Sequence, residues 1–153
     1  MLRDQLTQSM KTAMKEKDEI GLASVRLIQA ALKDRDIAAR SNGNNDGISD
    51  DEILSMLQSM IKQRRDSIEM YEKGGRPELA EREAKEIDVI ERFLPEQMDD
   101  DAAAAAIDKV IDELDANAMK DMGRVMAALK ERHAGCMDFG KASGVVKARL
   151  SGG

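Results

Sequence analysis

The residues best suited to nucleophilic chemistry are His133 and Cys136, the only histidine and the only cysteine of the chain. A histidine beside a cysteine can activate the thiol as a nucleophile, and Asp138 is the nearest carboxylate that could orient the pair. All three fall in one predicted loop, where residues three apart rarely face each other in the required geometry. One histidine and one cysteine also cannot form a four-ligand zinc site. We therefore expect no catalytic residues, no metal site and no cofactor.

Other signatures of enzymes are missing as well. The chain has neither a Walker A phosphate-binding sequence nor a strand–glycine–helix dinucleotide motif. No serine lies in the glycine-flanked turn that presents a nucleophile. The acidic pair Asp50-Asp51 comes at a predicted helix start, where negative charge stabilises the helix dipole. Any catalysis would therefore require a partner protein.

Basic residues near the C-terminus indicate a different chemistry, the binding of phosphate groups. The net charge is −6, but residues 95–118 carry one Lys against eight acids, whereas residues 119–153 carry seven Lys or Arg against three. Contact with a nucleic-acid backbone requires exposed cations. Such a cluster is also typical of an ordinary solvated helix face. The candidate nucleic-acid-binding residues are Lys120, Arg124, Lys130, Arg132, Lys141, Lys147 and Arg149.

Helices must position these residues. Aromatic residues make up only 2% of the chain, without tryptophan, and there are 11 methionines. A core of Leu, Ile, Val, Ala and Met suits helix packing better than a sheet. Apolar periodicity predicts an all-α protein, with an N-terminal bundle of about four helices in residues 1–94 and a small three-helix domain in residues 98–153. The helix predicted at about 18–40 is apolar nearly all round, so we expect it in the middle of the bundle.

Local signals mark the ends of several helices. Ser49 and Glu52 have the spacing of a capping box, in which each side chain bonds the other residue's amide. Gly74-Gly75 predicts a helix end, and Pro77 predicts the first turn of the next helix. Pro95 ends that helix and marks the expected domain boundary.

Two features interrupt the helical patterns. Arg64 and Glu83 fall on the apolar stripes of the two helices joined by Gly74-Gly75. In an antiparallel hairpin the two would lie at similar heights, which predicts a structural ion pair. The alternatives are a substrate-facing Arg–carboxylate pair or two exposed residues.

Gly123 lies inside a predicted helix, where glycine is unfavourable. It indicates close approach of another helix or, alternatively, of an RNA backbone.

Four stretches of the chain, residues 62–69, 74–81, 93–97 and 119–126, resemble the YqeY family. Proteins of this family are similar to the tail of the B subunit of the glutamine-dependent tRNA amidotransferase, a small helical domain that touches tRNA. Residues 98–153 look like that tail. The resemblance implies a helical fold and a tRNA partner. The kinase-like and amidase parts of the amidotransferase have no counterpart in this chain.

The chain departs from the family pattern in one loop. Relatives tend to have a basic residue between the glycine and the aspartate of this loop, whereas this chain has Cys136 and Met137 between Gly135 and Asp138. The departure puts an RNA contact from that loop in doubt.

These observations lead to one expected function and two alternatives. We expect an accessory tRNA-binding module related to the amidation of aminoacyl-tRNA. The alternatives are a component of a carbon–nitrogen ligase that uses glutamine as amido donor and acts with an amidotransferase-type partner, or a protein-interaction module without RNA.

A single cysteine, short apolar stretches and acidic residues near the N-terminus predict a cytoplasmic protein without a membrane partner.

Overall fold

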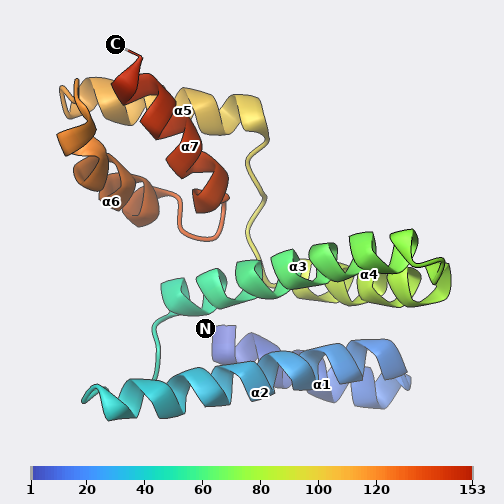
Figure 1. Ribbon diagram of the computed structural model, residues 1–153. Coiled ribbons are helices and arrows are strands. Elements are labelled where there is room, and N and C mark those ends of the chain that lie inside the picture. The colour runs from blue at the N-terminus through green and yellow to red at the C-terminus, as the bar shows by residue number, and fades with distance from the viewer. Residues whose placement is uncertain (1, 153) are drawn as a thin grey trace. The chain divides into compact units, whose positions relative to one another are not determined.

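The computed structural model describes residues 2–152, and all regular structure in this range is helical (Figure 1). The chain separates into two compact units, residues 1–95 and 96–153. The all-α prediction, with four helices followed by three, is confirmed. Over the described residues, no helix combines the length and apolarity that crossing a bilayer requires. The helices are α1 (Leu2–Glu16), α2 (Glu19–Ser41), α3 (Asp50–Lys73), α4 (Pro77–Glu91), α5 (Asp100–Glu113), the short 3-10 helix η1 (Met119–Asp121), α6 (Met122–Arg132) and α7 (Phe139–Ser151).

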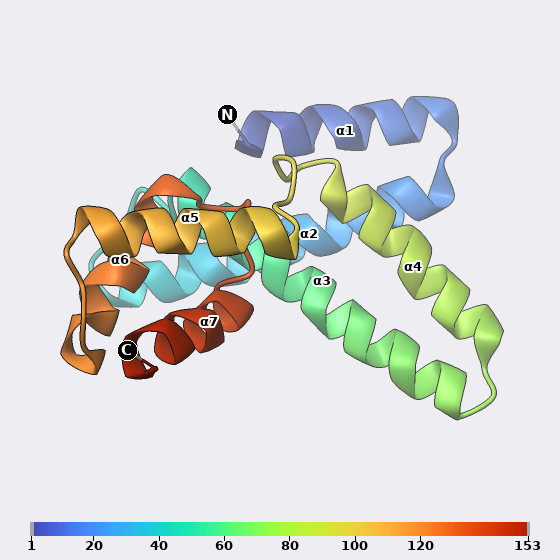
Figure 2. The same ribbon diagram turned by 90° about the horizontal axis from the view of Figure 1, so that it is seen from above.

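The first unit consists of two helical hairpins, α1–α2 and α3–α4 (Figures 1 and 2). Helix α2 joins them, because it packs against α4 and α3 as well as against α1. The hairpins meet over a core of aliphatic side chains and methionine, as expected for a chain so poor in aromatic residues. Its most deeply buried members include Leu6, Val25, Ile28, Ile53, Met56, Leu57 and Ile90.

Helix α2 is not enclosed on all sides. Val25 and Ile28 are buried, but Leu27 is 45% exposed and Ile37 is 49% exposed. The prediction that α2 lies in the middle of the bundle is therefore wrong for one of its faces. Helices α1, α3 and α4 all contact α2, but none of them covers Leu27 or Ile37.

The local sequence signals lie at the helix ends that they predict. The Ser49 side chain accepts a hydrogen bond from the Glu52 amide, and the Glu52 carboxylate accepts one from the Ser49 amide. Gly75 has φ of +72°, a left-handed conformation that glycine adopts without strain. Pro77 is the first residue of α4, and α4 ends at Glu91, before Pro95.

A charged clasp joins three parts of the first unit. Arg3 Nη1 and Nη2 donate to the two carboxylate oxygens of Asp36 at 2.8 and 2.9 Å. Arg3 Nη2 also donates to the carbonyl of Ile48 at 3.0 Å, while the Ile48 amide donates to Asp36 Oδ1 at 2.9 Å. The Arg3 guanidinium, helped by the Ile48 amide, lowers the pKa of Asp36 to about 2. The clasp thus ties the start of α1 to the last turns of α2 and to the loop before α3.

In the second unit, α5, α6 and α7 pack around Ile107, Val125, Leu129 and Val146. The loop between α6 and α7 adds Met137, which is fully buried in this core. The loop is held by the segment before α5, because the Met98 amide donates to the Cys136 carbonyl at 2.8 Å and the Gln97 side chain donates to the Gly135 carbonyl.

Two glycines of the loop between α2 and α3 allow a matched test of the clasp. Gly43 and Gly47 both have φ of +88°, but a Cβ on Gly43 would meet no atom within 4 Å, whereas one on Gly47 would lie 2.7 Å from Arg3 Nη2. Gly43→Ala should cost about 1–2 kcal/mol of stability from backbone strain alone. Gly47→Ala should cost about 2–4 kcal/mol, because it also displaces the clasp. Equal losses in urea denaturation would show that the clasp contributes nothing.

The clasp should also make stability depend on pH. Asp36 is ionised in the folded protein down to about pH 2, but its usual pKa is 3.8. The stabilisation is therefore complete above about pH 4 and is lost as the pH falls through about 2. Asp36→Asn should lower the free energy of unfolding by about 1–2 kcal/mol at pH 7, allowing for solvent screening at the partly exposed Arg3, and by much less at pH 2. Urea denaturation of both proteins between pH 7 and 2 measures the difference. A constant difference over this range would contradict the assignment.

Candidate nucleic-acid interface

The basic residues predicted to bind nucleic acid all lie on η1, α6 and α7, and all are exposed. They divide into two classes by their surroundings. The arginines form ion pairs within the second unit, whereas the lysines form none with any residue that the structure describes. The residues are Lys120 on η1, Arg124, Lys130 and Arg132 on α6, and Lys141, Lys147 and Arg149 on α7.

Each of the three arginines forms an ion pair with a carboxylate of its own unit. Arg124 pairs with Asp121 at 2.8 Å, at the start of α6. The other two pair with α5: Arg149 with Asp108 at 2.8 Å, and Arg132 with Glu113. The acidic helix α5 therefore neutralises two of the seven candidate cations. These arginines connect the helices of the unit and are less available to a phosphate.

The four lysines, Lys120, Lys130, Lys141 and Lys147, form no ion pair with any residue in the described range 2–152. Their ammonium groups extend from helices whose opposite faces are in the core. Their ammonium groups are therefore not held by a carboxylate of residues 2–152. The four lysines are therefore the strongest candidates for contact with an anionic backbone.

Gly123 lies between Lys120 and Lys130 on the exposed side of α6. A Cβ at this position would meet no atom within 4 Å. The interpretation that Gly123 permits close packing of another helix in the chain is therefore wrong. Ala127, one turn further along the helix, is exposed as well. Small residues between the lysines leave the backbone of α6 open to a large ligand. The interpretation that remains from the sequence is close approach of an RNA backbone.

Asp121 has a structural role that the sequence analysis missed. It is 8% exposed, and its carboxylate accepts hydrogen bonds from Arg124 Nη2 at 2.8 Å and from the Asn117 amide at 3.1 Å. The Arg124 guanidinium, with the Asn117 amide, lowers the pKa of Asp121. The sequence signal that could have indicated this role is an aspartate directly before a helix, followed three residues later by an arginine. Asp121 fixes the turn that presents Lys120.

His133 and Cys136 are not arranged as a catalytic pair. The hydrogen bond between them joins the Cys136 amide to the His133 carbonyl at 3.0 Å, so it involves backbone atoms alone. In this loop Met137 is fully buried in the core of the second unit. Among residues 2–152, no three His, Cys, Asp or Glu side chains converge to hold a metal ion.

The other predicted pair, Arg64 and Glu83, lies between α3 and α4. Arg64 Nε is 3.9 Å from Glu83 Oε2 but 3.0 Å from Glu86 Oε2. Arg64 Nη1 also donates to the Met60 carbonyl at 3.2 Å. The Arg64 and Glu86 side chains are each 14% exposed, so the shorter contact is also the better shielded from water. Glu86, one turn further along α4, was not predicted from the helical spacing.

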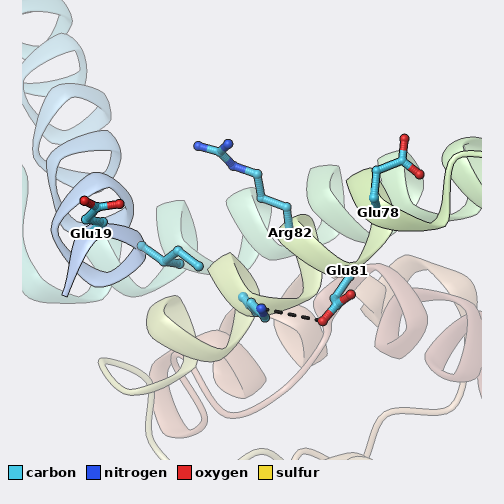
Figure 3. A pocket seen from close by; sticks show the side chains of 6 residues that line it. Glu19, Glu78, Glu81 and Arg82 are labelled. Atoms are coloured by element: carbon cyan, nitrogen blue, oxygen red, sulfur yellow. Dashed lines mark ion pairs between the residues drawn. The ribbon is translucent and has the colours of Figure 1, made fainter.

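The first unit also contains a shallow pocket of about 280 Å³ between the start of α2 and α4. Figure 3 shows Glu19 on α2, and Glu78 and Arg82 extending from one side of α4. Glu81 forms an ion pair with Lys85 at 3.5 Å, and Glu78 pairs with Arg76 at 2.8 Å outside the pocket. Arg82 likewise pairs with Glu86, outside the lining, at 3.8 Å. Each charged lining residue of α4 thus has an ion-pair partner, so the pocket lacks the convergent polar groups of a small-molecule site.

Comparison with known proteins decides the family. The chain matches the model of the YqeY-like proteins over residues 3–150. It belongs to the YqeY family. The match includes both units, so the family resemblance is a property of the whole described fold.

Fungal relatives of this YqeY protein carry the name altered inheritance of mitochondria protein 41, mitochondrial. The chain is 30% identical to that of Lachancea thermotolerans over 89 residues, 58% of this chain and 46% of the relative. It is 31% identical to that of Candida glabrata, over 60% of this chain and 48% of the relative. With the protein of Pyrenophora tritici-repentis it shares 28% identity over 83% of this chain and 70% of the relative. The chain thus spans about half the length of the first two relatives, and the names assign these relatives to mitochondria rather than to the cytoplasm.

The contacts of Arg64 predict unequal effects of two isosteric substitutions. Glu86→Gln should lower the free energy of unfolding by about 1–2 kcal/mol, because it leaves a poorly solvated guanidinium without its closest partner. Glu83→Gln should cost less than about 0.5 kcal/mol, as expected for a longer and more exposed ion pair. Urea denaturation of the two variants at pH 7 distinguishes them. A larger loss for Glu83→Gln would contradict the contact distances.

Proposed function

We propose that this YqeY-family protein is an accessory module that binds tRNA and is related to the tRNA-dependent amidation of aminoacyl groups. The observation that carries the proposal is the presence on η1, α6 and α7 of four exposed lysines that form no ion pair within the described residues 2–152. They lie within residues 98–153, which the family resemblance noted in the sequence likens to the tail of the amidotransferase B subunit. Two independent lines, local charge and family likeness, therefore favour the same surface.

The proposed mechanism is electrostatic docking of this surface on the backbone of a folded RNA. Lysine ammonium groups contact phosphates as point charges and release counterions when they bind. Phe139 is half-buried and is the only aromatic residue of the second unit, so stacking on an unpaired base contributes little. Such contacts favour recognition of RNA shape over recognition of base sequence.

In this proposal the chain binds and orients, and the chemistry belongs to a partner. Neither His133 with Cys136 nor Arg64 with its carboxylates is arranged to activate a nucleophile. An amidotransferase-type protein would supply the amide transfer. The role suits the cytoplasm predicted from the sequence and equally the mitochondrion named for the fungal relatives, because both contain tRNA.

The proposal predicts salt-dependent binding of tRNA by the full chain. Fluorescence anisotropy with labelled tRNA between about 50 and 200 mM salt should give a slope of log K against log salt of about −3 to −4, for about four phosphate contacts. Lys120→Glu with Lys130→Glu should weaken binding and reduce that slope by about 2, because two contacts are lost.

A matched control separates the surface from net charge. Lys11→Glu with Lys62→Glu changes the charge of the chain by the same amount at two exposed lysines of the first unit. This control should bind tRNA nearly as the unmodified chain does. Equal weakening by both double variants would exclude the α6 surface as the binding site. Absence of binding by the unmodified chain at 50 mM salt would exclude the proposed function.

A further inference from the structure

The loop between α2 and α3 contains the only asparagine of the chain that is followed by a glycine, Asn42 before Gly43 (Figure 1). In such a pair the main-chain nitrogen of the glycine can attack the side-chain carbonyl carbon of the asparagine, because glycine has no Cβ to obstruct the approach. The product is a five-membered succinimide ring. The pair can therefore undergo a modification that needs no enzyme.

The other three asparagines of the chain are less suited to this reaction. Asn44 is held at both ends of its side-chain amide, because its Oδ1 accepts from the Asp46 amide at 3.0 Å and its Nδ2 donates to the Gly47 carbonyl at 2.9 Å. The same two bonds hold the one Asp-Gly pair, Asp46 and Gly47, whose ring closure would release water. Asn45 and Asn117 are each followed by a residue whose Cβ hinders the attack.

The structure leaves the side chain of Asn42 available. Asn42 is exposed, and its side-chain amide forms no hydrogen bond with any residue in the range 2–152. The attacking nitrogen is held only at the helix end, where the Gly43 amide donates to the Arg40 carbonyl at 3.0 Å. Helix ends fray, and a Cβ on Gly43 would meet no atom within 4 Å. The last turn can therefore open for the reaction without disturbing packed neighbours.

We propose that Asn42 is a site of spontaneous deamidation and that its products loosen the clasp. The Gly43 nitrogen loses its proton to water and bonds to the side-chain carbonyl carbon of Asn42. The bond from that carbon to the amide nitrogen breaks, and ammonia leaves. Water then adds to one of the two succinimide carbonyls and opens the ring. One opening yields aspartate, and the other yields isoaspartate, in which the main chain runs through the former side chain.

Both products disturb the end of α2. Asn42 is the C-cap of this helix, and the amides of Asn42, Gly43 and Asn44 donate to the carbonyls of Ala39 and Arg40. A carboxylate at this place meets the negative end of the helix dipole, which is unfavourable. Isoaspartate also adds a methylene group to the main chain, so the three amides can no longer all reach the same carbonyls.

The disturbed loop is the one that contributes to the clasp. Gly47 and Ile48 lie five and six residues after Asn42, and Ile48 binds Arg3 through its carbonyl and Asp36 through its amide. Gly47 lies so close that an added Cβ would be 2.7 Å from Arg3 Nη2 and 2.9 Å from Asp36 Oδ1. The clasp has no room for a shifted loop. A longer main chain before it should therefore weaken these hydrogen bonds.

The first test is incubation of the folded full chain at pH 8, with peptide mapping by mass spectrometry at intervals. Conversion of the amide to an acid should be about tenfold faster at Asn42 than at Asn45, because glycine offers the attack no Cβ. The rate should fall at pH 6, since the attacking nitrogen must lose its proton. Methyl transfer from S-adenosylmethionine by an isoaspartyl methyltransferase counts the isoaspartate. The chain unfolded in urea, incubated in parallel, gives the rate without structure.

Variants locate the reaction and its effect. Asn42→Gln should abolish deamidation at this position, because the longer side chain would have to close a less favourable ring. Asn45→Gln is the matched control and should leave the rate unchanged. In urea denaturation the aged chain should unfold at a lower urea concentration than the fresh chain, whereas aged Asn42→Gln should not. The loss on ageing should be smaller in Asp36→Asn, in which the clasp is already weakened.

Four results would overturn the proposal. The first is an unmodified Asn42 in the folded chain after a period that converts the unfolded chain completely. The second is an equal rate at Asn42 and Asn45. The third is a deamidated chain that unfolds at the same urea concentration as the fresh chain. The fourth is an equal loss of stability on ageing with and without Asp36→Asn, which would confine the damage to the end of α2 and exclude the clasp.

Discussion

The arrangement of the first unit depends on one guanidinium group. Helix α1 has only Leu2, Leu6 and Ala13 buried, which is little apolar area to fix its position against α2. The short turn at Lys17 and Asp18 determines where the two helices meet at one end. Arg3 determines the other end, because it binds both carboxylate oxygens of Asp36. Its third hydrogen bond, to Ile48, extends the constraint to the entry of α3. A planar, bidentate side chain is suited to this role in a way that lysine is not.

Features whose causes lie within a few residues could be predicted from the sequence. The capping box at Ser49 and Glu52, the end at Gly74-Gly75 and the start at Pro77 all occur where the pattern placed them. Long-range partners could not be predicted in the same way. Arg3 and Asp36 are both charged helix residues without any local signal of their pairing. Helical spacing aligns α3 with α4 only to within about one turn, so it could not decide whether Glu83 or Glu86 would be closer to Arg64.

Periodicity shows which side chains are apolar but not which neighbour covers them. This is why α2 was expected at the centre of the bundle although Leu27 and Ile37 face outward. The same limit applies to Gly123, whose unfavourable position indicated close packing that the structure does not contain. At the candidate interface, the sequence alone gives the seven basic residues. The division into paired arginines and unpaired lysines needed the positions of Asp108, Glu113 and Asp121 in space.

That division has a consequence for specificity. The arginines, whose planar donors could read a phosphate or a base edge in a fixed geometry, are used inside the second unit. The unpaired lysines are flexible, strongly hydrated charges that bind phosphate with little preference for orientation. A surface of this kind holds RNA but selects weakly among RNA molecules. In the proposed function, selection must therefore come from elsewhere. The amidotransferase-type partner of the proposed function would supply this selection.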